Sequence, residues 1–244
     1  MNTGVQIAAS GLKAQVEALD MLANNLANIN TNGFKEQKAF FTYLDESAGS
    51  ATIGDNDPGS MRAVSVQGAL NVRDGLMQPT QREYDIALVG DGFLAVETPQ
   101  GVRYTRNGSL RLNEKSELVT SDGHPVLGAK GRITVTPPGR LVVNEQGGVY
   151  SDNKLLGQLK LVTFDGPAAM VQEGNSLLAP RNAQATPKKA DVQVKQGYLE
   201  QSNVNAVGSI VEMIGIMRRY EAMQKSVGLL LNEVDSRSIE RLGR

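Results

Sequence analysis

Glycine spacing after a short apolar run is the first pattern in this sequence that could support chemistry. Gly90-Asp91-Gly92-Phe93-Leu94-Ala95 follows the run Tyr84–Val89 with the spacing of a dinucleotide-binding turn. In such a turn the second glycine opens a helix whose amides hold a pyrophosphate. Residues 93–99 instead alternate as a strand does and end at Pro99. The segment therefore predicts a hairpin turn and no nucleotide site.

Two other segments contain catalytic or metal-binding residue types without the required spacing. Ser121, Asp122 and His124 are sequential in one predicted turn, which prevents a nucleophile, a base and an orienting acid from lining up. Residues 55–59 begin like a calcium loop, but the twelfth position is Val66 rather than glutamate. With no cysteine and a single histidine, we predict no catalytic, cofactor-binding or metal-binding residue and no enzyme.

Charge and hydropathy exclude further classes of partner. The 25 Lys and Arg residues nearly balance 26 Asp and Glu residues, so no global field favours nucleic acid. No 18 apolar residues run together, which predicts no transmembrane segment. The first residues lack the positive charge and apolar run of a cleavable signal peptide, so any export needs another route.

The elements at the two ends are predicted to be long helices. All nine prolines lie between Pro58 and Pro187. Near the N-terminus an apolar stripe with three- and four-residue spacing is interrupted by one polar residue, Gln15; its members are Val5, Ala8, Leu12, Leu19, Leu22, Leu26 and Ile29. This spacing is typical of a coiled-coil seam. We expect the helix to end near Asn30–Gly33, where Gly33 takes a left-handed conformation as its C-cap.

The C-terminal segment has a matching stripe, interrupted by Gln224 and capped by Ser202, Asn203 or Asn205; its members are Ile210, Met213, Met217, Tyr220, Val227, Leu231 and Val234. Laid antiparallel, the two stripes match in order from Val5 with Val234 to Ile29 with Ile210, and Gln15 then faces Gln224. We hypothesise that this polar layer fixes the register within or between subunits, because a slip would place each amide against hydrocarbon. The alternative is two ordinary amphipathic helices packed on a core.

Three asparagines beside the N-terminal stripe, Asn24, Asn25 and Asn28, are candidates for hydrogen bonds to neighbouring helices, with local or solvent hydrogen bonding as the alternative. The 19 seam and asparagine positions together form the predicted assembly interface. A seam with an alanine and a glutamine layer buries little apolar surface. We therefore expect the terminal helices to form only when neighbouring molecules are present.

The middle of the chain predicts β-structure. Asp74-Gly75, Asp91-Gly92, Asn107-Gly108, Asp122-Gly123 and Gly147-Gly148 separate short runs at 84–89, 93–98, 102–105, 109–112, 131–136 and 158–164. Short strands with such turns favour antiparallel pairing. The predicted fold class is α+β, with terminal coiled-coil helices flanking a central antiparallel β domain. The predicted segments are an N-terminal helix 1–32, a linker 33–60, the β domain 61–198 and a C-terminal helix 199–244.

Three segments in order then resemble the bacterial flagellar basal-body rod and hook family: residues 24–35 (NNLANINTNGFK), 85–128 (DIALVGDGF to HPVLG) and 196–227 (QGYLEQSNVNAV to MQKSV). The resemblance implies a structural subunit that transmits motor torque in the periplasmic rod. It implies export by the flagellar type III apparatus, and helical assembly with other rod subunits and copies of itself. The short interval between Gly33 and Asp85 resembles proximal rod members more than distal ones. A secreted β domain that binds glycan or another ligand is the remaining alternative.

Overall fold

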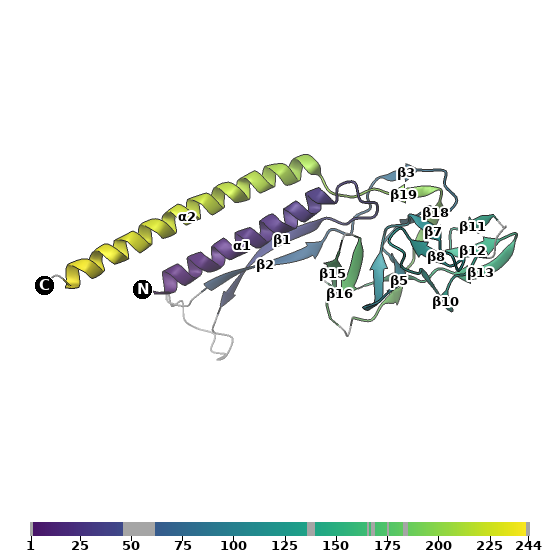
Figure 1. The fold of residues 1–244 in the computed structure, drawn as a ribbon, viewed down its shortest axis with the longest axis horizontal. Helices are drawn as coiled ribbons and strands as arrows, with labels where there is room; N and C mark the ends of the chain where they lie inside the picture. The colour runs from purple at the N-terminus through teal and green to yellow at the C-terminus, as the bar shows by residue number, and fades with distance from the viewer. Residues whose placement is uncertain are drawn as a thin grey trace. The chain divides into compact units, whose positions relative to one another are not determined.

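The computed structural model describes residues 2–45, 62–135, 140–164, 166, 169–174, 176–182 and 185–242 (Figure 1). The chain divides into two compact units, which are described separately. The first, here the helical unit, comprises Met1–Asn24, Lys38–Gly68 and Ala206–Arg244. The second, here the β body, comprises Asn25–Gln37 and Ala69–Asn205.

Two long helices and one pair of strands make up the helical unit. Helix α1 spans Asn2–Ala27 and helix α2 spans Ala206–Leu242. Strands β1 (Gln37–Asp45) and β2 (Arg62–Leu70) pair into a two-stranded sheet. The helices lie side by side and run antiparallel (Figure 1). In the described part of the chain, neither helix has a stretch apolar enough to cross a bilayer.

The core of the helical unit is small. Ala18, Leu22 and Ile216 are its fully buried members, and Leu19, Ala39, Val66 and Met213 pack around them. The two helices and the strand pair therefore each contribute side chains to one cluster. Its size limits the stability that it supplies, since each buried aliphatic side chain contributes about 1.5–3 kcal/mol.

Strand β1 corrects the predicted linker 33–60 over its described part. Lys38-Ala39-Phe40-Phe41-Thr42 is rich in aromatic and β-branched residues, which favour strands. The remainder of that linker, residues 46–60, and the rejected calcium-like segment within it lie outside the described residues.

The β body is built from short antiparallel strands. A six-stranded sheet has the order β15-β16-β6-β5-β14-β17, formed by Met170–Glu173, Leu177–Pro180, Gly101–Thr105, Phe93–Thr98, Leu161–Thr163 and Lys188–Lys189. A three-stranded sheet joins β11, β12 and β13, formed by Leu141–Val143, Gly148–Ser151 and Lys154–Gln158. The α+β class with a central antiparallel β region is confirmed.

Four further strand pairs complete this unit. They are β4 with β18 (Ile86–Val89, Gln193–Gln196), β3 with β19 (Met77–Pro79, Tyr198–Glu200), β7 with β8 (Leu110–Leu112, Leu118–Thr120) and β9 with β10 (Leu127–Gly128, Gly131–Arg132). Each pair is antiparallel. Two of these pairs, β4 with β18 and β3 with β19, join strands more than 100 positions apart in the chain. The first strands of the β body therefore gain their partners only from its last strands.

Strand β5 has both faces buried. Leu94 and Val96 enter one apolar cluster, whereas Phe93 and Ala95 enter a second cluster with Tyr104, Phe164 and Met170. Because alternate residues of a strand point to opposite faces, one short run serves two cores. This explains the nearly continuous apolar sequence after Gly92.

The predicted hairpin at Gly90–Gly92 is wrong in one respect. A turn does join β4 to β5, and no helix follows it. However, β4 pairs with β18, while β5 pairs with β6 and β14, so the two strands belong to different sheets. Apolar runs on both sides of a turn indicate burial of each strand but do not specify their partners.

The predicted C-cap at Gly33 also needs correction. Helix α1 ends at Ala27, and Gly33 lies six residues further on with φ +69°. A Cβ atom at Gly33 would lie 2.3 Å from the Arg106 carbonyl carbon. The left-handed conformation is therefore present, but the glycine serves a close approach of two backbones.

Gly108 allows another close approach and supplies a test of the β body. A Cβ atom there would lie 1.8 Å from the Ile86 carbonyl oxygen. The Gly108 carbonyl also accepts a hydrogen bond from the Ile86 amide. We expect Gly108→Ala to lower the free energy of unfolding by about 3 kcal/mol, because the backbones must separate. Urea titration followed by circular dichroism measures this change.

Gly157→Ala is the matched control. A Cβ atom at Gly157 would make an ordinary contact, 3.4 Å from the Ile133 Cγ1 atom. We expect that variant to change stability little. Equal losses in both variants would show that the backbone approach at Gly108 is not the cause.

Candidate functional site

The buried stripe of α1 consists of small residues together with one predicted leucine, Leu22. Ala14 and Ala18 are 2% and 0% exposed, and Gly11 is buried with them. A Cβ atom at Gly11 would lie 3.1 Å from the Met223 Sδ atom of α2. Small side chains permit helices to approach closely, so this side of α1 meets α2 within the chain.

The predicted α1 positions flank that buried stripe. Leu22 is buried, whereas Ala8, Leu12, Leu19, Leu26 and Ile29 are half-buried. The Gln15 Oε1 atom is buried and has no hydrogen-bond partner among the described residues. The Val5 side chain lies outside the described residues. A leucine flank, defined as Leu12, Leu19 and Leu26, is thus left partly uncovered.

The predicted α2 positions fall on two different sides of that helix. Met213, Tyr220 and Val227 are half-buried, on the side that includes the buried Ile216. Ile210 and Met217 are exposed. The side chains of Leu231 and Val234 lie outside the described residues.

The register proposed for the two helices does not occur within this chain. It would place Gly11 opposite Gly228, but the close neighbour of Gly11 is Met223. The Gln224 Nε2 atom donates to the Tyr220 hydroxyl at 3.0 Å and not to Gln15. The helices follow the small-residue stripe because it permits closer packing than the leucines allow.

A continuous apolar stripe of α2 faces away from α1. We call Val207, Ile210, Val211, Ile214 and Met217 the α2 stripe; their three- and four-residue spacing places them on one side of the helix. Val207 is 72% exposed, Val211 64% and Ile214 47%. Contiguous exposed apolar surface of this kind marks a protein-interaction site.

The asparagines of the predicted interface make local hydrogen bonds. Asn25 is fully buried, and its side-chain amide donates to the Gln37 carbonyl at 2.8 Å while accepting from the Gln37 amide at 2.9 Å. Asn28 is also buried, and its Oδ1 atom accepts from the Thr31 hydroxyl. Asn24 is exposed. Asn25 therefore fixes the chain reversal between α1 and β1.

A buried charge cluster lies within the β body, where the segment that follows α1 and the segment that precedes α2 come together. Lys35 Nζ lies 2.7 Å from Glu200 Oε1, and Arg106 Nη1 lies 3.0 Å from Glu200 Oε2. Arg106 Nη1 also lies 2.8 Å from Asp74 Oδ1. The side chains of Lys35, Arg106 and Glu200 are each 1% exposed. We call these four residues the charge clasp.

Backbone hydrogen bonds extend the clasp to its neighbours. The Gly33 amide donates to the Glu200 carbonyl at 2.7 Å, and the Glu36 amide donates to Asn203 Oδ1 at the same distance. The Asn203 side-chain amide donates to the carbonyls of Asn71 and Arg73 at 2.8 Å each. The segment after α1 and the segment before α2 are therefore bonded directly to one another.

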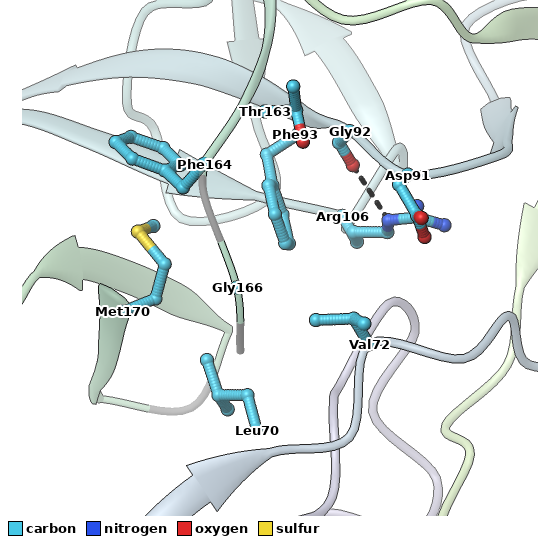
Figure 2. Close-up of a pocket in the computed structure, with 10 residues that line it drawn as sticks. All are labelled: Leu70, Val72, Asp91, Gly92, Phe93, Arg106, Thr163, Phe164, Gly166 and Met170. Atoms are coloured by element: carbon cyan, nitrogen blue, oxygen red, sulfur yellow. Dashed lines mark hydrogen bonds between the residues drawn. The ribbon is translucent and has the colours of Figure 1, made fainter. Parts of the chain in front are cut away.

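Arg106 also borders a small cavity of about 190 Å³ (Figure 2). Its Nε atom donates to the Gly92 carbonyl at 2.8 Å, and its guanidinium carbon lies 5.6 Å from the centre of the Phe93 ring. Leu70, Val72 and Met170 line the opposite side. The guanidinium is already bonded to carbonyls and carboxylates, so Asp91 is the other charged side chain that lines this cavity.

The surroundings of Lys35 in the clasp shift its pKa in both directions. Burial lowers the pKa of Lys35, and the positive charge of Arg106 lowers it further, whereas Glu200 and Asp74 raise it. The net shift is downward. Glu200 is therefore the residue on which the charged form of Lys35 depends.

No catalytic constellation accompanies these features. Across the described ranges, no three His, Asp or Glu side chains gather as a metal site requires. Ser121, Asp122 and His124 lie in the turn after β8, with their side chains outside the core. The described features that stand out are the buried charge clasp and the exposed apolar side of α2.

Comparison with known proteins gives the same class. The flagella basal body rod protein model matches residues 6–35, the flagellar hook protein FlgE/F/G D1 domain matches 87–151, and the flagellar basal body rod FlgEFG C-terminal model matches 195–228. The chain is 34% identical to FlgF of Caulobacter vibrioides, covering 93% of this chain and 92% of that protein. It is 31% identical to FlgF of Mesorhizobium japonicum, covering 91% and 90%.

FlgG of Buchnera aphidicola from Acyrthosiphon pisum is similar at 31% identity, covering 91% of this chain and 93% of that protein. These likenesses extend over nearly the whole length of each relative. The chain belongs to the flagellar basal-body rod protein family. It is a structural rod protein of the flagellar basal body, so the prediction of a structural subunit rather than an enzyme is confirmed, and the ligand-binding alternative does not apply.

The charge clasp was not predicted from the sequence. Lys35 and Glu200 lie within two of the segments that carry the family resemblance, but they are 165 positions apart. Nothing in their local spacing indicates that they meet. A charged residue inside an otherwise apolar or small-residue motif was the signal that could have suggested burial, as with Glu200 after Tyr198 and Leu199.

The clasp predicts a large loss of stability when its shared anion is removed. In Glu200→Gln, Lys35 and Arg106 keep their buried positive charges without that carboxylate. We expect the free energy of unfolding to fall by about 3–5 kcal/mol, as when one partner of a buried ion pair is deleted. Urea unfolding at neutral pH measures the loss.

Glu97→Gln is the control for a carboxylate in an exposed ion pair. Glu97 lies 2.8 Å from Arg132, and both side chains are over 40% exposed. Solvent screens such a pair, so we expect only a small change in stability. A comparable loss in both variants would contradict the structural weight given to Glu200.

The lowered pKa of Lys35 predicts a pH effect of known sign. Below the folded-state pKa, both folded and unfolded chains carry the proton on Lys35. Between that value and 10.5, the folded chain has released the proton while the unfolded chain retains it, so stability rises with pH. We expect the stability of the wild type relative to Lys35→Met to increase as pH approaches 10.5. Parallel pH profiles would refute this assignment.

Proposed function

We propose that this chain is a proximal rod subunit of the FlgF type, exported through the flagellar type III apparatus and assembled in the periplasm. The alignments with FlgF of Mesorhizobium japonicum and with FlgG of Buchnera aphidicola from Acyrthosiphon pisum each cover 91% of this chain. They run over 224 and 243 positions respectively. The FlgG relative thus has more residues for which this chain has no counterpart. This supports FlgF over the distal FlgG alternative, as does the short interval between Gly33 and Asp85.

The observation that carries the assembly mechanism is the exposed α2 stripe. Five large apolar side chains lie on one helix side that no other described part of the chain covers. Covering them with a neighbouring rod subunit contributes about 1.5–3 kcal/mol for each fully buried side chain, before the cost of ordering. We propose that α1 of a neighbouring copy, through its leucine flank, packs against this stripe in a coiled-coil manner.

Gln15 supports a contact between subunits. Its Oε1 atom is buried without a hydrogen bond, and leaving such an acceptor unsatisfied costs about 1–3 kcal/mol. A donor from another subunit relieves that cost once the Gln15 side chain turns out of its buried position on assembly. Pairing of Gln15 with Gln224 of a neighbouring chain therefore remains our hypothesis for the register, together with the predicted contributions of Val5, Leu231 and Val234.

This arrangement joins unlike surfaces, the α1 flank of one copy and the α2 stripe of the next. Such heterologous contacts propagate into an open helical assembly when the rotation does not close. The terminal helices then form the inner tube, and the β body lies outside it. If the helices gain most of their stability from neighbours, an exported chain stays unassembled until it reaches the growing rod.

Ile214, at the centre of the α2 stripe, tests the assembly mechanism. In Ile214→Asp a charge occupies the proposed contact, while the exposed site does not disturb the isolated chain. We expect incorporation into the rod to fall at least about thirtyfold, from a loss of about 2 kcal/mol or more at the interface. Counting labelled chains in isolated basal bodies measures incorporation.

Ser226→Asp is the matched control, because Ser226 is exposed on a different side of the same helix. We expect it to assemble, and circular dichroism of both variants should match the wild type. Normal incorporation of Ile214→Asp would overturn the proposed role of the α2 stripe.

A further inference from the structure

A basic groove lies along one edge of the six-stranded sheet of the β body. It has a volume of about 940 Å³ and is bordered by Lys160, Lys188 and Lys189, with Asp191 as the one acidic residue in its lining. Strand β17, Lys188–Lys189, is the last strand in the sheet order, so it forms this edge. The groove belongs wholly to the β body and does not involve the helices.

The lysines of the groove keep their charges exposed. Lys160 and Lys189 are exposed, and within the described ranges neither forms an ion pair with an acidic side chain. Two arginines of the same unit are paired: Arg132 contacts Glu97 and Glu117, and Arg103 contacts Glu173. Lys160 and Lys189 therefore carry positive charges that no acidic side chain of the described residues neutralises.

The floor of the groove is apolar. Leu161 and Val192 are half-buried, and Leu159, Val162 and Ala190 are buried beneath the same surface. A ligand with negative charges and a small apolar group matches this combination of rim and floor.

One segment of the sequence has that chemistry. Between Lys38 and Arg62 there is no Lys or Arg, but there are four acidic residues, Asp45, Glu46, Asp55 and Asp57. Ile53 is the single large aliphatic residue between Glu46 and Pro58. Ile53, Asp55 and Asp57 occupy alternate positions, which share one side of an extended chain.

We propose that the groove over β14 and β17 binds the acidic segment 45–57 of a second copy of this chain. The inference rests on the proposed helical assembly and adds a contact of the β body to it. The charges of Asp55 and Asp57 complement those of Lys160 and Lys189, and the aliphatic Ile53 complements the apolar floor. Because groove and segment are different surfaces, each copy offers one of each, and the contact repeats along the assembly.

A zero-length carbodiimide cross-link tests the contact, because it joins a carboxylate to a lysine amine only when the two touch. We expect isolated basal bodies to give peptides joining Lys160 or Lys189 to Asp55 or Asp57, and dilute full-length monomer to give none. Mass spectrometry identifies the linked peptides. Cross-links already present in dilute monomer would assign the groove to the chain's own segment and overturn the proposal.

Charge reversal provides the second measurement. Lys160→Glu with Lys189→Glu should reduce incorporation into the rod about fivefold at low salt, in keeping with two exposed ion pairs, and Asp55→Lys with Asp57→Lys should do the same. Combining the four substitutions should restore incorporation. Lys115→Glu, an exposed lysine outside the groove lining, is the control.

The outcomes separate this proposal from the proposed function. If the wild-type chain is found in the shaft but no cross-link forms and the charge swap restores nothing, the groove contact is wrong while the rod assignment stands. If the wild-type chain is absent from the shaft, the proposed function fails and the groove contact fails with it.

Discussion

The shared carboxylate of Glu200 is the constraint on which the organisation of this chain depends. It neutralises two buried cations that come from distant parts of the sequence, Lys35 and Arg106. Burying such charges gains little net stability over an apolar core, because desolvation offsets most of their attraction. The arrangement contributes structural specificity instead. Few alternative packings place a carboxylate beside both cations, so the segments around them adopt one arrangement.

The helical unit has two kinds of apolar surface, one buried within the chain and one exposed. Small residues of α1 bring α2 close within one chain, whereas larger apolar residues of both helices remain partly or wholly uncovered. A chain that used its leucines for itself would have less apolar surface to offer a neighbour. The separation explains how the same helix can serve both a folded subunit and an assembly.

Sequence patterns predicted elements better than they predicted partners. Both terminal helices lie near their expected positions, and each of the six expected strand runs overlaps an observed strand, because hydrophobic period and turn residues are local signals. The side of α1 that is buried within the chain lies about one residue from the predicted assembly seam, since Gly11, Ala14 and Ala18 do not register as an apolar stripe. Strand β1, the partners of β4 and the clasp depend on contacts between distant residues, which local spacing does not encode.

The bonds around Asn203 have a mechanical consequence. Residues that leave α1 and residues that enter α2 are stapled to each other and to the loop at 71–75 by several short polar bonds in close proximity. A force that separates the segment after α1 from the segment before α2 loads these hydrogen bonds at the same time. Hydrogen bonds loaded together resist rupture better than hydrogen bonds broken one after another. These bonds therefore resist together any force that pulls the segment after α1 away from the segment before α2.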